Sequence, residues 1–301
     1  MRIHHPPFRI PNHASTTAAA DFHLITLRPV FDILVASIAD TNLTALVVNG
    51  LACVAPTPSH FRFGVDALRV LQEMNAGGAS EFSEAVSFEI FRRLLGATLV
   101  NTEMSIAYKW QEWSKKTDYT CRVAEDVLAV SVTRAMKFGP APFTAEDASR
   151  LLEKKLYGCQ MSNRDVLSAD RWKKQCLHIL TGHQYIVDLL RTTFVSILEH
   201  TPELVGDTVV VITLTTNTPF LYYNFCANQS ALQFVHGDTA KTPAGGAVSV
   251  HVVVLGGTAP ASSSGLLLHV VESNLGKAQA GKSEAKTMHA LKTLHRARYC
   301  L

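Results

Sequence analysis

From residue 80 onward, the spacing of apolar residues alternates between helical and extended periods. A helix is predicted over 80–95, capped by a serine, because its apolar residues return to one face every three or four positions. A second helical stretch is predicted over 104–113. Two β-branched stretches, 117–123 and 127–133, follow with only three residues between them, which is typical of a hairpin.

The pattern continues with two more helix–strand pairs. Thr144 is suited to cap a helix that Gly158 would end, with acids in its first turn. A short strand over 175–180, an amphipathic helix over 185–198 and a β-branched, central strand over 207–215 come next. The order helix, hairpin, helix, strand, helix, strand predicts an α/β sandwich built on a mixed sheet.

The segments outside this pattern are predicted to form irregular extensions. A helix near 30–38, a strand at 45–48 and a helix around 65–74 are expected before the core. Beyond about residue 228 the chain is rich in Gly, Ala, Ser, Thr and Pro, and its last residues are basic. Four parts are therefore expected: a loose leader over 1–20, an N-terminal extension over 21–79, the main domain over 80–228, and a low-complexity basic tail over 229–301.

Composition narrows the class of protein. A chain of 301 residues with 47% hydrophobic residues can bury a full core. The net charge of +3 does not by itself imply nucleic-acid binding. None of the six cysteines forms a C-x-x-C pair, and no apolar run has the length of a membrane span or resembles a signal peptide. A soluble intracellular protein with no membrane partner is expected.

The hairpin has the outline of a metal-dependent nuclease centre. Such centres hold Mg²⁺ with an acid on one strand, and place an acid and a lysine two residues apart on the next strand. Asp118 fits the first position, but Ser131 and Thr133 stand where the acid and lysine are required. Glu84 or Glu89 offers an acid from the preceding helix. The competing interpretation is an ordinary turn aspartate beside ordinary strand hydroxyls.

The same residues resemble the retrotransposon hot spot proteins of trypanosomes. The resemblance covers about 85–225. It rests on five segments: 116–119 (Lys-Thr-Asp-Tyr), 129–135 (Ala-Val-Ser-Val-Thr-Arg-Ala), 143–144 (Phe-Thr), 151–158 (Leu-Leu-Glu-Lys-Lys-Leu-Tyr-Gly) and 177–180 (Leu-His-Ile-Leu). It implies a restriction-endonuclease-like core, related to Crinkler-type effectors, with links to the nucleus, chromatin and RNA. Family members pair this domain with a nucleotide-hydrolysing region that does not precede the hairpin here, so a truncated copy of a larger parent is one expectation.

Ser131 and Thr133 belong to the family motif. The resemblance therefore implies that the loss of the acid and the lysine is not peculiar to this chain, and it favours a degenerate nuclease. The expected function is therefore binding of nucleic acid or of a protein assembly, in the nucleus or cytoplasm, without a cofactor. The alternative is a Mg²⁺-dependent DNase with migrated groups, for which Lys155, Lys154 and Glu153 on the following helix are available. The candidate catalytic set is Asp118, Ser131, Thr133, Glu89 and Lys155, with Asp118 as the metal ligand.

A second motif lies near the end of the chain. Residues 276–283 match the phosphate-loop pattern through Gly276, Gly281, Lys282 and Ser283. The strand before it ends too early, and too little chain follows for a second acidic strand. A chance match in a Gly-, Ala- and Lys-rich tail is the favoured interpretation.

The remaining candidates are weaker. His178 and His183 are expected to be structural. The side chains of Tyr108, Trp110, Trp113 and Tyr119 are expected to pack in the core, with base stacking as the alternative. The basic tail over 282–298 is expected either to contact phosphates or to be solvated.

Overall fold

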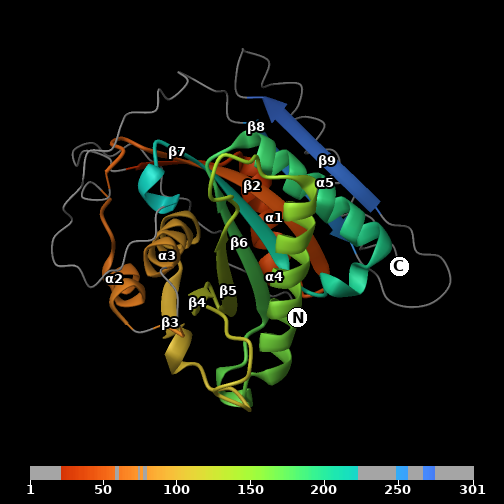
Figure 1. Ribbon diagram of the computed structural model, residues 1–301. Helices are drawn as coiled ribbons and strands as arrows, with labels where there is room; N and C mark the ends of the chain where they lie inside the picture. Colours follow the sequence, from red (N-terminus) through yellow and green to blue (C-terminus); the bar gives the residue numbers. More distant parts are fainter. Residues whose placement is uncertain are drawn as a thin grey trace, which may run out of the picture.

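The computed structural model describes residues 22–57, 61–73, 75–76, 80–222, 249–256 and 267–274. Within these residues, nine strands form one mixed sheet in the order β3-β4-β5-β6-β7-β2-β8-β9, with β1 also pairing with β2 (Figure 1). The strands are β1 (Phe22–Ile25), β2 (Leu43–Cys53), β3 (Thr98–Thr102), β4 (Tyr119–Val123), β5 (Asp126–Arg134), β6 (Lys174–Thr181), β7 (Val209–Thr216), β8 (Ser249–Gly256) and β9 (Leu267–Asn274).

The centre of the sheet is parallel and its edges are antiparallel. Strands β5, β6, β7 and β2 run parallel, with Val132 beside His178 and Thr213 beside Asn49. Strands β3 and β4 continue the sheet antiparallel on the β5 side, and β8 and β9 do so on the β2 side. The mixed-sheet α/β class is confirmed.

Helices cover both faces of the sheet, and each face has its own apolar core. The helices are α1 (Arg28–Ala39), α2 (Val65–Gln72), α3 (Glu81–Leu95), α4 (Ala145–Asp165) and α5 (Gln184–His200). Helices α1, α2 and α3 contribute to one core, and α4 and α5 contribute to the other. Figure 1 shows α4 and α5 side by side across one face. Parallel strands covered on both faces explain why every residue of β6, and every residue of β7 except the last, is buried.

The predicted helix starts are correct, and one predicted end is wrong. Ser80 is the N-cap of α3, and Thr144 forms a capping box with Asp147 at the start of α4. Helix α4 does not end at Gly158 but continues to Asp165. Buried positions recur beyond the glycine, including Cys159 and Ser162, so tertiary packing offsets the poor helix propensity of one glycine.

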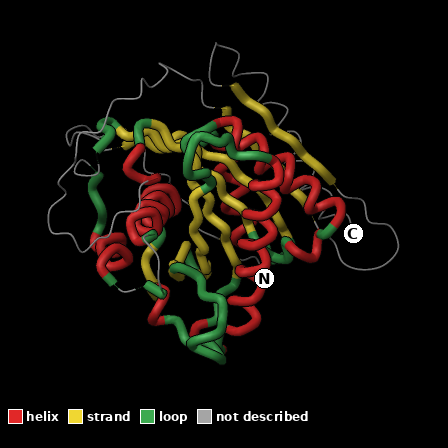
Figure 2. Tube along the Cα trace, in the orientation of Figure 1, coloured by secondary structure: helices red, strands yellow, loops and turns green. Residues whose placement is uncertain are grey.

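The helix predicted over 104–113 is wrong. A short 3₁₀ turn, Glu103–Ser105, follows β3, and the rest of the β3–β4 connection contains no regular helix or strand. This connection runs along the lower end of the molecule in Figure 2. Tyr108 lies in a third small apolar cluster, whereas Trp110 and Trp113 are exposed. The prediction of a helix over 104–113 assumed that its aromatic residues would be buried against a neighbouring element. Because Trp110 and Trp113 are exposed, that reason for a helix is absent.

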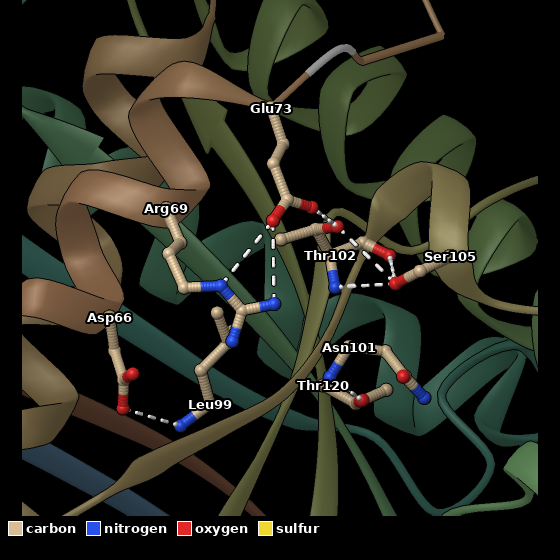
Figure 3. Close-up of polar contacts among 8 residues, drawn as sticks. All are labelled: Asp66, Arg69, Glu73, Leu99, Asn101, Thr102, Ser105 and Thr120. Carbon is tan, nitrogen blue, oxygen red and sulfur yellow. Dashed lines mark hydrogen bonds and ion pairs between the residues drawn. The ribbon is translucent and has the colours of Figure 1, made fainter.

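Helix α2 closes the outer edge of the sheet by polar contacts (Figure 3). The Asp66 carboxylate accepts a hydrogen bond from the Leu99 N–H of β3 at 3.0 Å. The Glu73 carboxylate accepts from the Thr102 hydroxyl and pairs with Arg69. An edge strand that exposes its backbone N–H groups invites pairing with another chain, so these carboxylates protect β3.

Residues 21–79 do not form a separate extension, because β2 lies inside the sheet between β7 and β8. Lys174, which is fully buried at the start of β6, also forms hydrogen bonds with this segment. Its ammonium donates to the carbonyl oxygens of Asp40, Thr41 and Leu43 at 3.2, 3.2 and 2.9 Å. All three ammonium donors are thereby satisfied, which a buried charge requires. The boundary expected near residue 80 therefore does not separate two folding units.

The expected tail is partly regular, since β8 and β9 extend the sheet. The leader over 1–20, the phosphate-loop match over 276–283 and the basic segment over 282–298 lie outside the described residues. Among the described helices, none combines the length and apolarity that crossing a bilayer requires. Cys53, Cys121, Cys159 and Cys176 are buried, and none of these four described cysteines forms a disulfide bond.

Candidate functional site

Two predicted site residues, Asp118 and Lys155, both contact the backbone of Val132 in β5. Backbone pairing continues from β4 to the Asp118 N–H, which donates to the Val130 carbonyl at 3.1 Å. The Asp118 carboxylate then accepts from the Val132 N–H at 2.5 Å, in place of a strand partner. From the neighbouring helix α4, the Lys155 ammonium donates to the Val132 carbonyl at 3.3 Å. The side chains of Asp118 and Lys155 therefore both hydrogen-bond the backbone of Val132, one at its N–H and the other at its carbonyl.

Glu84, in the first turn of α3, supplies a second carboxyl group. Its side chain is 3% exposed, and burial together with the charge of Asp118 raises the pKa of Glu84 to about 8. Burial also raises the pKa of Asp118 to about 6, although Lys155 and the Val132 N–H oppose the rise. At neutral pH Glu84 is mainly protonated, whereas Asp118 is mainly ionised.

Two further charged groups surround this pair. Burial raises the pKa of Glu103, which follows β3, while the charges of Lys116 and Lys155 act against the rise. Arg134, at the end of β5, has its pKa lowered by burial, and the charge of Glu84 partly offsets that effect. Neither Glu103 nor Arg134 is among the site residues predicted from the sequence. We call the following residues the charged cluster: Glu84, Glu103, Lys116, Asp118, Arg134 and Lys155.

Glu89 and Lys154 do not belong to the charged cluster. The Glu89 carboxylate pairs with Arg92 at 2.6 Å and with Arg93 at 2.7 Å, and it accepts from the Gly64 N–H at 3.0 Å. Burial acts to raise the pKa of Glu89, but the hydrogen bonds from Arg92, Gly64 and Arg93 lower it. Lys154 is exposed. The helix acid beside Asp118 is therefore Glu84, because a five-residue shift on a helix places Glu89 on another face.

The two β5 hydroxyls differ in their surroundings. Ser131 is buried, its hydroxyl lies 3.3 Å from that of Thr117, and it also hydrogen-bonds the Cys159 thiol. Thr133 is half-buried two residues further along β5 and shares a face with Ser131. Ser131 is thus held within the packing between β5 and α4 and does not provide an acid's role.

The fit of a divalent cation to this site is incomplete. Carboxylate oxygens are suitable Mg²⁺ ligands, and the charge of Asp118 raises the pKa of Glu84. However, within the described residues no three side chains of the His, Cys, Asp and Glu types lie close enough together to hold a metal ion. One carboxylate is also already engaged by the Val132 N–H. The site offers two carboxyl groups and water positions rather than a complete set of protein ligands.

A buried polar chain crosses the sheet behind the charged cluster. It runs from the Tyr119 hydroxyl through Ser87 (2.8 Å) to His178 Nδ1 (2.7 Å), and from His178 Nε2 through Thr213 (2.7 Å) to Asn49 (2.5 Å). Thr213 donates to Asn49 Oδ1, so the ring proton of His178 lies on Nε2 and Nδ1 accepts from Ser87. Burial lowers the pKa of His178 to about 3, which keeps the ring neutral. The contacts of His178 agree with the structural role expected for it.

A separate cavity of about 510 Å³ opens at the carboxyl ends of β5 and β6. It is lined by the connection 135–143, the start of α5 and Tyr222. The carboxyl ends of parallel strands are the usual ligand-binding edge of an α/β sheet. Tyr222 also interacts electrostatically with Arg134, so this cavity borders the charged cluster.

Comparisons with known proteins leave the family open. No family model matches the chain. The AAC-rich mRNA clone AAC4 protein of Dictyostelium discoideum is 31% identical over 190 residues, which cover 61% of this chain but only 27% of that protein. Among solved structures, SfsA of Pyrococcus furiosus in complex with Ca²⁺ aligns with 45% of this chain and 56% of its own, at 11% identity and a TM-score of 0.24. That likeness is too weak to carry an argument. The chain thus resembles a segment of a longer protein whose name describes its messenger RNA.

Proposed function

We propose that this domain binds nucleic acid in the nucleus, as a restriction-endonuclease-like domain of the retrotransposon hot spot type whose catalytic centre is degenerate. The observation that carries the proposal is the meeting of Asp118, Lys155 and Glu84, from β4, α4 and α3, around β5. An acid beside the first hairpin strand and an acid from the preceding helix fit the nuclease pattern, whereas Lys155 comes from the following helix in place of a lysine on the second strand. The incomplete set of metal ligands favours binding over cleavage.

The cations of the charged cluster support an anionic ligand. Because burial keeps Glu84 largely protonated at neutral pH, it contributes little negative charge. The other acids near the cluster, Glu81, Asp118 and Glu103, are matched in number by three cations: Lys116, Lys155 and Arg134. Lys155 has ammonium donors beyond the one used on Val132, and these can contact a phosphate group.

Replacing Lys155 with alanine is expected to weaken nucleic-acid binding. Loss of one phosphate contact should reduce the slope of log affinity against log salt by about 1. The measurement is fluorescence anisotropy of a short labelled duplex over a series of salt concentrations.

Lys154→Ala is the matched control. It removes the same charge from the adjacent position on α4, where the side chain is exposed. The control is expected to retain the wild-type slope. Equal losses in the two variants would show that only the general charge of α4 matters, and would contradict a phosphate site at Lys155.

The alternative function is a Mg²⁺-dependent DNase. The charge of Asp118 raises the pKa of Glu84, and this pair of carboxyl groups, with Lys155 alongside, favours it. A cation would have to displace the proton of Glu84, so metal binding in that case would strengthen as the pH rises toward 8. Once bound, the ion would polarise a phosphodiester and lower the pKa of a water.

Plasmid nicking in Mg²⁺ or Mn²⁺ separates the two functions. The binding proposal expects no metal-dependent nicking by the wild type above the buffer level. Asp118→Asn is the informative variant, because its amide oxygen can still accept from the Val132 N–H and preserve the fold. Nicking by the wild type that disappears in both Asp118→Asn and Glu84→Gln would establish the enzyme and refute the degenerate centre.

A further inference from the structure

Two tryptophans stand exposed on one turn of the β3–β4 connection. Trp110 is 55% exposed and Trp113 is 83% exposed, although large aromatic side chains are usually mostly buried. The Trp110 carbonyl accepts hydrogen bonds from the N–H groups of Trp113 at 3.1 Å and of Ser114 at 2.9 Å, which closes a single helical turn. Residues three apart on such a turn lie on the same side, with Cβ atoms about 5–6 Å apart. The two indoles therefore emerge as neighbours.

This tryptophan turn, residues 110–113, is held rigidly by the segments beside it. Tyr108 forms a β-bridge with Val166, and the Lys109 N–H donates to the Asp165 carbonyl at 2.9 Å. The Tyr108 N–H donates to the Gln111 side chain at 3.1 Å, and Tyr108 packs in the third apolar cluster. An exposed pair on an anchored turn loses little conformational entropy when a ligand binds.

Lysines lie on both sides of the tryptophan turn along the chain. Lys109, Lys115 and Lys116 flank it, against one acid, Glu112, within the same stretch. Lys109 and Lys116 each donate one hydrogen bond to a backbone carbonyl, which leaves further ammonium donors for a ligand. Lys116 also belongs to the charged cluster, and three residues of chain span at most about 11 Å. The tryptophan turn therefore lies within about 11 Å of Lys116, one of the residues of the charged cluster.

We propose that Trp110 and Trp113 form a stacking platform for unpaired bases, so that the nucleic acid taken by this domain is single-stranded where it crosses the tryptophan turn. This inference rests on the proposed nucleic-acid binding and specifies its substrate class. Aromatic side chains interleaved with lysines are the usual means of binding single strands, because every base offers a π-face and every linkage a phosphate. In a duplex the base faces are hidden, so the indoles would find no partner.

The charges argue against a protein partner on the same surface. The centres of protein interfaces are depleted of lysine, whereas three lysines border these two indoles within eight residues.

The test uses the full chain and its own fluorescence. The chain has three tryptophans, and the third, Trp172, is buried, so Trp110 and Trp113 report directly on quenching by bases. The probes are oligothymidylate, an abasic oligonucleotide of the same length and a duplex of the same length. Oligothymidylate should quench the emission, and the abasic strand should bind at least about 5-fold more weakly. Trp110→Ala and Trp113→Ala should each weaken oligothymidylate binding by about 5-fold or more, and leave duplex binding unchanged.

Phe138→Ala is the control, because Phe138 is 70% exposed on another connection. Circular dichroism should show that all three variants fold, since each changed side chain is exposed. Undiminished oligothymidylate binding in both tryptophan variants, or equal binding of the abasic strand, would overturn the stacking platform while Lys155-dependent binding remained. Self-association lost in Trp113→Ala would assign the platform to a protein contact and overturn it also. A wild type that binds none of the probes would refute the proposed function itself, and the inference with it.

Discussion

Replacing His178 with alanine is expected to lower the free energy of unfolding by about 3–5 kcal/mol. Both ring nitrogens are hydrogen-bonded, to Ser87 and to Thr213, each at 2.7 Å. Removal of the ring takes one hydrogen-bond partner from each of two buried hydroxyls, at about 1–3 kcal/mol each, while Ser87 keeps Tyr119 and Thr213 keeps Asn49. It also leaves a cavity beside Phe91, whose ring centroid lies 5.2 Å from that of the imidazole. Urea unfolding at neutral pH measures the loss.

Two comparisons divide that loss into its parts. His178→Phe fills most of the volume but makes neither hydrogen bond, so it should be intermediate between alanine and wild type. His183→Ala is the control, because His183 is exposed at the start of α5, and it should cost less than about 1 kcal/mol. If His178→Ala were as stable as His183→Ala, the chain from Tyr119 to Asn49 would not stabilise the fold.

The same residue determines part of the acid sensitivity. The pKa of His178 is about 3 in the folded protein and about 6.5 in an unfolded chain. Between those values the unfolded chain binds the extra proton, so the contribution of His178 is complete above about pH 6.5 and is lost as the pH falls toward 3.

Glu84→Gln is expected to stabilise the protein at alkaline pH and to remove the loss of stability that the wild type shows as the pH rises. The pKa of Glu84 is raised from 4.5 to about 8 by burial and by Asp118, so the folded protein binds the proton more tightly. Its contribution is therefore complete below about pH 4.5 and is lost as the pH rises through about 8. Each pKa unit corresponds to about 1.4 kcal/mol, so the wild type should lose on the order of 5 kcal/mol across this range. Glutamine is neutral throughout and should not show that loss.

Urea midpoints measured from about pH 5 to pH 9 test this expectation. Glu153→Gln, which removes an exposed carboxylate from α4, is the control and should follow the wild type. Asp118→Asn should move the loss of stability to lower pH, because the charge that raises the pKa of Glu84 is gone. A wild-type stability that does not fall between pH 6 and 9, or a Glu84→Gln variant that falls equally, would show that Glu84 is not held protonated. Mg²⁺ that stabilises the wild type at pH 8 but not Glu84→Gln would favour the DNase alternative.

Much of the fold follows from local patterns in the chain. The spacing of apolar residues places α3, the β4–β5 hairpin, α4, β6, α5 and β7 in order. Ser80 and Thr144 mark helix starts, and Thr144 does so through a capping box with Asp147 that needs no distant partner. These predictions succeed because amphipathic periodicity and capping are short-range effects. Gly158 misleads for the same reason: local propensity disfavours the helix there, and only packing against the sheet sustains it.

The candidate site is less predictable from local pattern. Asp118 and Lys155 are candidates in the sequence, but 37 positions separate them, and only the pairing of β4 with β5 and the packing of α4 bring them to the backbone of one residue, Val132. Glu89 looks as suitable as Glu84, because both lie on α3 and nothing local records which face meets β4. Glu103 lies in no motif, and Arg134 lies in the 129–135 segment without a pattern that marks it as a site residue.

The sequence by itself determined the α/β class, the order of the central elements, and the presence of an acid, two hydroxyls and a lysine near one hairpin. Only the tertiary structure decided that β2 lies inside the sheet, that Glu84 and not Glu89 faces Asp118, and that Trp110 and Trp113 are exposed. The physical reason is range. Helix periods, caps and turns depend on residues within about four positions of one another, whereas burial, pKa and exposure depend on groups that strand pairing brings together from across the chain.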